Sequence, residues 1–135
     1  MDREQKELFR GKMKSYHFLI CYLKEMNDKR KELYDEMAGL KGISYDRIPS
    51  TPNPEATENY RLTMIDRIAE VDSEISIHQL KLDMLNITLN RIADPERQMY
   101  LLKYRDRRTY EAIGKLFGYS PSGIFMRMDH ALDEL

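Results

Sequence analysis

The sequence predicts an all-α protein: a long antiparallel helical hairpin, or coiled-coil arm, followed by a C-terminal helix-turn-helix domain of three helices. Apolar residues recur every three or four positions along two long stretches, and a proline-rich segment separates these stretches. The last third of the chain contains shorter helical patterns punctuated by glycine and proline. We therefore expect two domains, residues 1–93 and 94–135.

The first predicted helix spans about residues 2–40. Its apolar seam has coiled-coil spacing, with one charged member, and consists of Tyr16, Leu19, Leu23, Met26, Arg30, Leu33, Met37 and Leu40. The segment 41–54 is predicted to be a loop, because the prolines at positions 49, 52 and 54 exclude regular structure.

The second predicted helix spans about residues 55–93. Its seam begins at Met64 or Ile65 and continues through Ile68, Val71, Ile75, His78, Leu82, Leu85, Leu89 and Ile92. Two helices of similar length joined by one loop are expected to fold back on each other. In that register, Arg30 is predicted to lie near Asp66 or Glu70.

One end of this hairpin has more apolar surface than a single partner helix can cover. Residues 16–23 are apolar on nearly every side, and the second helix carries an additional apolar stripe. This surplus must meet either the C-terminal helices or a second copy of the protein. We expect a homodimer whose interface includes Phe18, Cys21, Tyr22, Ile77, Leu80, Met84 and Ile87.

The C-terminal domain is predicted to begin with a helix at Asp94-Pro95-Glu96, with Met99, Leu102 and Tyr104 on its packed face. Thr109 is expected to cap the next helix, whose apolar face is Ile113, Leu116 and Phe117. Tyr110 and Gly114 suit a close crossing of this helix with the one that follows.

Gly118 is expected to end that helix, and Ser120 followed by Pro121 starts the last one. The expected buried face of the last helix is Ile124, Met128, Leu132 and Leu135. A helix, a tight glycine turn and a second helix have the spacing of a DNA-reading helix-turn-helix.

The flank of the last helix that faces away from this core contains the candidates for reading DNA bases: Ser122, Phe125, Met126, Arg127, Asp129 and His130. Arg127 is the best candidate for a guanine edge, with Ser122, Met126 and His130 as neighbouring base contacts. Between Arg97 and Arg127 the chain has seven basic residues against two acidic ones. The predicted phosphate contacts are Arg105, Arg107, Arg108, Thr109, Tyr110 and Lys115.

Residues 94–132 resemble region 4 of bacterial sigma factors, without a gap. The matching positions are Lys103, Tyr104, Thr109, Tyr110, Glu111, Ile113, Gly118, Ser120, Ile124, Arg127 and Ala131. This resemblance implies binding of double-stranded promoter DNA in the major groove. The hairpin and its loop, Gly42 to Pro54, are similar to phage late-gene transcriptional regulators of the RinA and ArpU type, which implies activation of late phage genes in a bacterial host.

Two alternative functions are compatible with the same pattern. Small DNA-recognition subunits of phage packaging terminases also combine a helix-turn-helix with oligomerising helices. The second alternative is a protein-interaction module that binds host RNA polymerase without specific DNA contact. It is suggested by apolar residues such as Phe125 and Met126 on the reading helix, although these residues also suit thymine methyl groups.

Composition and the absence of known motifs exclude several classes of function. The chain has 135 residues and a formal net charge of −1, and its single cysteine excludes an internal disulfide. No phosphate loop, paired metal-ligand motif or nucleophile with a matching base is recognisable, so we expect a non-enzyme with no cofactor and no metal. The sequence contains no signal peptide and no apolar span of membrane length, which predicts the cytoplasm of the bacterial host.

Overall fold

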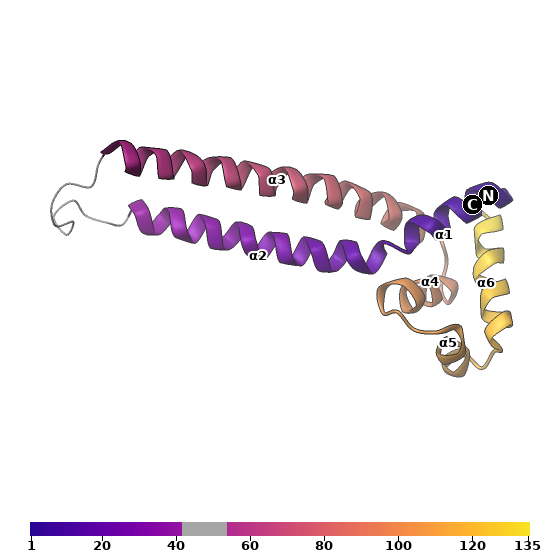
Figure 1. The fold of residues 1–135 in the computed structure, drawn as a ribbon. Helices are drawn as coiled ribbons and strands as arrows, with labels where there is room; N and C mark the ends of the chain where they lie inside the picture. Colours follow the sequence, from indigo (N-terminus) through magenta and orange to yellow (C-terminus); the bar gives the residue numbers. More distant parts are fainter. Residues whose placement is uncertain (42–53) are drawn as a thin grey trace. The chain divides into compact units, whose positions relative to one another are not determined.

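The structure is a computed structural model that describes residues 1–41 and 54–135. Throughout these residues the regular elements are helices, which confirms the predicted all-α class (Figure 1). In chain order they are α1 (Arg3–Met13), α2 (Tyr16–Lys41), α3 (Pro54–Asn90), α4 (Glu96–Tyr100), the π-helix η2 (Leu101–Arg105), α5 (Tyr110–Phe117) and α6 (Pro121–Asp133). The predicted loop lies, apart from its two ends, outside the described residues. Among the helices that the structure describes, none is both long and apolar enough to cross a membrane.

The described helices form two compact units. The first contains Met1–Cys21 and Gln79–Leu135, and the second contains Tyr22–His78. This division differs from the expected boundary at residue 94. The reason is that Leu19 of α2 and Leu89 of α3 belong to the same hydrophobic core as Ile113 and Ile124 from the C-terminal helices.

In the second unit, α2 and α3 pair in antiparallel directions around Leu33, Met64, Ile68 and Val71. Met64, and not Ile65, is therefore the buried member of the α3 seam. Hydrogen bonds between Tyr22 and Glu74 (3.1 Å) and between Tyr60 and Glu36 (2.5 Å) join the two helices. These pairs confirm that the two helices fold back on each other within this unit.

The partner of Arg30 differs from the sequence prediction. Its guanidinium contacts Asp72 at 3.3 Å, instead of Asp66 or Glu70. Helical side chains lean toward the N-terminus of their own helix. In an antiparallel pair, that direction leads toward later residues of the partner helix, which explains the choice of Asp72.

The predicted helix over residues 2–40 is interrupted, and this part of the prediction is wrong. Helix α1 ends at Met13, and the Ser15 carbonyl accepts the first hydrogen bond of α2 from Leu19 at 2.9 Å. The Ser15 amide donates to the Lys12 carbonyl at 3.1 Å, and residues 14 and 15 form a turn between the two helices. The break lets Phe9 and Met13 of α1 join the hydrophobic core of the first unit.

The C-terminal helices supply much of that core. Met99, Ile113, Ile124, Met128 and Leu132 are buried, as the sequence predicts. Leu102, Tyr104 and Leu135 pack against the same core while remaining partly exposed.

Tyr100, which the sequence analysis did not place in the core, is among the largest fully buried side chains. Its hydroxyl donates a 2.7 Å hydrogen bond to the Met128 carbonyl and so joins α4 to α6. Burial raises the pKa of the Tyr100 hydroxyl above its usual value, so the group stays protonated and remains a donor.

Candidate nucleic-acid interface

The caps of α5 and α6 are formed by the residues that the sequence predicts. The Thr109 hydroxyl accepts a hydrogen bond from the Ala112 amide, and the Ser120 hydroxyl accepts one from the Gly123 amide, both at 3.1 Å. Pro121 is the first residue of α6, where its missing N–H costs nothing. These caps fix where each helix begins.

Residues 118–120 form the turn between α5 and α6. Gly118 has a φ of 77°, a left-handed conformation that favours glycine. The amides of Gly118 and Tyr119 both donate to the Gly114 carbonyl, at 2.8 and 2.9 Å. A Cβ atom on Gly114 would clash with the Tyr119 carbonyl, so glycine allows the turn to lie directly against α5. The expected close approach at Gly114 is therefore present, with the turn as its partner.

Helix α6 has one buried face and one exposed face. Ile124, Met128 and Leu132 point into the core. Three of the four predicted base contacts lie opposite them and are exposed: Ser122, Met126 and His130. Met126 has 58% of its surface exposed, so its side chain is available for contact with a ligand.

The fourth predicted base contact, Arg127, lies at the edge of this exposed face. Its guanidinium carbon is 4.0 Å from the centre of the Tyr119 ring, and one of its nitrogens is 3.7 Å from the Glu96 carboxylate. Stacking and the ion pair limit the conformations of this long side chain. Neither Tyr119 nor Glu96 was among the predicted site residues.

The opposite edge of α6 contacts α1. Asp129 was expected on the groove-facing flank, but it accepts hydrogen bonds from Lys6 (3.1 Å) and Arg10 (2.9 Å). Lys6 also forms an ion pair with Asp133. The Arg10 guanidinium lies 5.5 Å from the centre of the Phe125 ring, which also packs perpendicular to the Tyr110 ring at 6.0 Å between centres.

These contacts change how the acids of α6 titrate. Burial by itself raises the pKa of Asp129, but hydrogen bonds and charge from Lys6 and Arg10 outweigh it and leave this pKa below 3.8. The hydrogen bond from Lys6 likewise lowers the pKa of Asp133 below its usual value. Both carboxylates are therefore ionised at neutral pH. The stability that these contacts contribute is present above pH 3.8 and is lost as the pH falls through the lowered pKa values.

Most predicted phosphate contacts are exposed: Arg105, Arg107, Arg108, Thr109 and Lys115. Tyr110 is half-buried, and its ring centre lies 4.1 Å from the Lys103 ammonium, a cation that the sequence analysis left out of the site. Arg105 is already paired with Asp106 at 3.0 Å. The segment before α5 and the first turns of α5 are therefore basic and exposed. Among the predicted cations, Arg105 is the least available to bind a phosphate.

The backbone near this basic loop is tied to α2. His17 donates from Nδ1 to the Arg105 carbonyl at 2.8 Å, and its Nε2 is 3.4 Å from the Cys21 sulfur. Arg107 adopts a φ of 55°, uncommon for a residue with a side chain. In the part of the chain that the structure describes, no group of three or more His, Cys, Asp or Glu side chains is placed to hold a metal ion.

The residues predicted to mediate dimerisation are mostly exposed. Within the first unit these are Phe18, Cys21, Leu80, Met84 and Ile87, and in the second unit Ile77 is exposed. Tyr22 is half-buried, and its ring lies 4.3 Å from that of His78.

Leu116, expected on the packed face of α5, is instead 64% exposed. The core side of α5 is already occupied by Ile113.

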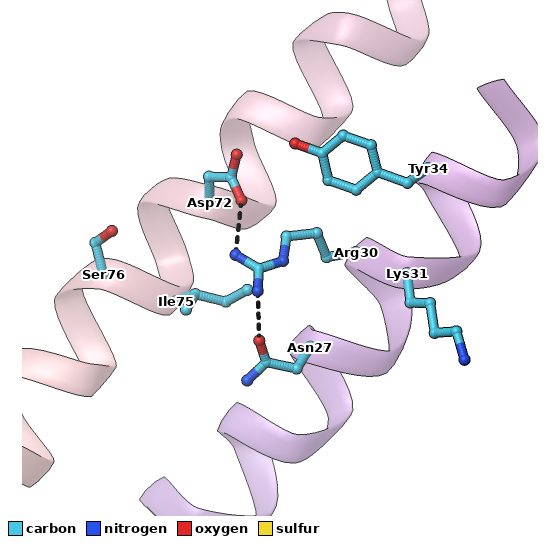
Figure 2. Close-up of a pocket in the computed structure, with 7 residues that line it drawn as sticks. All are labelled: Asn27, Arg30, Lys31, Tyr34, Asp72, Ile75 and Ser76. Atoms are coloured by element: carbon cyan, nitrogen blue, oxygen red, sulfur yellow. Dashed lines mark hydrogen bonds and ion pairs between the residues drawn. The ribbon is translucent and has the colours of Figure 1, made fainter. Parts of the chain in front are cut away.

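A cleft of about 610 Å³ lies between α2 and α3 in the second unit (Figure 2). It is lined by Asn27, Arg30, Lys31, Tyr34, Asp72, Ile75 and Ser76. The Arg30 guanidinium points across it and binds Asp72 at 3.3 Å and Asn27 at 3.0 Å. Asp72 and Asn27, which line the cleft, already bind the Arg30 guanidinium, and we therefore interpret the cleft as part of the contact between α2 and α3.

Comparisons with protein-family models, curated proteins and solved structures found no match to this chain.

Proposed function

We propose that this chain is a phage-encoded, sequence-specific DNA-binding regulator of transcription that activates late genes. In this proposal α6 enters the major groove of double-stranded DNA. The observation that carries the proposal is the exposed face of α6. It combines small and apolar side chains, Ser122 and Met126, with an arginine held at its edge, and it follows a capped turn of fixed geometry.

Each group has a distinct role in this proposal. Arg127 donates two hydrogen bonds to a guanine edge, and Tyr119 and Glu96 hold its guanidinium beforehand. Met126 contacts a thymine methyl group. The exposed cations Arg107, Arg108 and Lys115 bind phosphates and set the register of the protein on the duplex without reading sequence.

The test compares Arg127→Ala with Arg107→Ala in binding to fragments of the protein's own genomic neighbourhood at two salt concentrations. We expect Arg127→Ala to lose about 1–3 kcal/mol on the preferred site and to relax base preference there. Arg107→Ala should weaken binding to all sequences alike and reduce the salt slope by about one. Both side chains are exposed, so circular dichroism should confirm that both variants remain folded.

Other outcomes of this experiment identify other functions. Absence of specific DNA binding by the unmodified chain at low salt contradicts the proposal and favours a module that binds host RNA polymerase. Specific binding by a large ring of subunits, measured by light scattering, indicates the packaging subunit instead.

We also propose that the regulator is a homodimer that uses the exposed stripe Leu80, Met84 and Ile87 of α3. These side chains recur at helical spacing and are each more than half exposed. A dimer would place two copies of α6 on two half-sites of an operator.

Met84→Glu should convert the dimer to a monomer in light scattering, because a charge buried at an apolar contact is costly. Gln79→Glu adds the same charge to α3 at an exposed position on another side of the helix, and it should leave the mass unchanged. A monomer before any substitution contradicts this assignment.

A further inference from the structure

Helix α6 has a charge that does not suit a helix placed against DNA. Helix α6 (Pro121–Asp133) contains one basic residue, Arg127, and two acidic residues, Asp129 and Asp133. Its acidic residues therefore exceed its basic residues by one. DNA presents a negative charge about every 1.7 Å along its axis. By itself, this helix would be repelled by the phosphates that flank the major groove.

Helix α1 supplies the missing positive charge. Lys6 contacts both acids, and Arg10 contacts Asp129 at 2.9 Å. Adding these two cations changes the local balance from an excess of one acid to an excess of one base. The Lys6 and Arg10 side chains are 11% and 23% exposed, so they are held against α6 and are not free to bind phosphates themselves.

Apolar packing already attaches α1 to the same unit. Phe9 and Met13 are buried in its core, and the Phe9 ring meets that of Tyr100 at 5.8 Å between centres. Partly exposed ion pairs contribute little to folding, typically less than about 1 kcal/mol. The positive charges of Lys6 and Arg10, in contrast, change the electrostatic potential at the surface of α6.

We propose that Lys6 and Arg10 are charge-compensating residues that make α6 compatible with the DNA backbone without touching DNA. This inference rests on the proposed function and adds a second element, α1, to the DNA-binding site. It treats Asp129 and Asp133 as groups that oppose DNA binding and are neutralised by their partners in α1.

The test uses substitutions that remove the same contact from its two sides. Arg10→Gln should weaken DNA binding, and Asp129→Asn should strengthen it, each by about twofold to fivefold at low salt. This magnitude corresponds to a unit charge about 10 Å from one or two phosphates in water. The double variant should bind like the unmodified protein, because the local charge balance is restored.

A merely structural role for the ion pair predicts a different pattern. If the contact only holds α6 in place, Arg10→Gln and Asp129→Asn lose the same contact, and both weaken binding. That result overturns the inference while leaving the proposed function intact. Failure of the unmodified protein to bind DNA overturns both.

Glu4→Gln is the matched control for the change in net charge. Glu4 is an exposed carboxylate on α1, two positions before Lys6 and so on a different side of the helix. This variant should change DNA affinity less than Asp129→Asn does. An equal gain in both variants would assign the effect to total charge and would contradict a specific role for α1.

Discussion

Gly114→Ala should destabilise the first compact unit by about 3 kcal/mol, near the upper end of the usual cost of inserting a methyl group into a packed site. The new Cβ atom would clash with the Tyr119 carbonyl, which belongs to the backbone and cannot rotate away. Alanine favours helix over glycine by only about 1 kcal/mol, so the clash should dominate. Amide hydrogen exchange of Ile113 and Ile124 measures this loss at the two helices concerned.

Gly11→Ala is the control for this experiment, since it makes the same chemical change in a helix of the same unit. Apart from adjacent residues and the backbone of α1 itself, no atom lies within 4 Å of the Cβ that it would add. This variant should therefore stabilise the unit, by about 0.5–1 kcal/mol. If Gly114→Ala were as stable as Gly11→Ala, the turn would not lie against α5 as described.

Ile113→Ala should cost about 2–5 kcal/mol, the usual range for removing a large aliphatic side chain from a core. Ile113 is fully buried and belongs to the core that also contains Met99, Ile124 and Leu132. Thermal unfolding followed by circular dichroism measures the effect. Near the lowered unfolding temperature, the variant should also lose DNA affinity, because α5 and α6 share this core.

Leu116→Ala is the matched variant on the same helix. Leu116 is 64% exposed, so its truncation should change stability by no more than about 0.5 kcal/mol. A large loss of stability in Leu116→Ala would indicate that Leu116 packs against a partner molecule.

The elements that could be predicted from sequence are those governed by neighbouring residues. The caps at Thr109 and Ser120, the turn at Gly118 and the buried face of α6 all depend on side chains within a few positions of each other. The same reasoning failed at Lys14 and Ser15. There the apolar periodicity continues across the junction, and the chain breaks to let Phe9 and Met13 reach the core.

Within the candidate site, sequence reasoning identified the exposed residues but not the groups that hold them. Helical periodicity placed Ser122, Met126 and His130 correctly on an exposed face. The same periodicity misplaced Asp129, because its partners Lys6 and Arg10 come from a distant helix. It gave no indication of the contact between Glu96 and Arg127, because no periodic pattern relates positions so far apart in the chain.

Short-range propensities and periodicity were sufficient to predict the helical class, the hairpin seams and the helix, turn and helix of residues 109–135. Packing between distant segments was needed to show that the ends of the hairpin share a core with the C-terminal helices and that α1 neutralises the acids of α6. Asp129 lies 119 residues from Arg10, and pairing at that separation depends on packing of the whole unit.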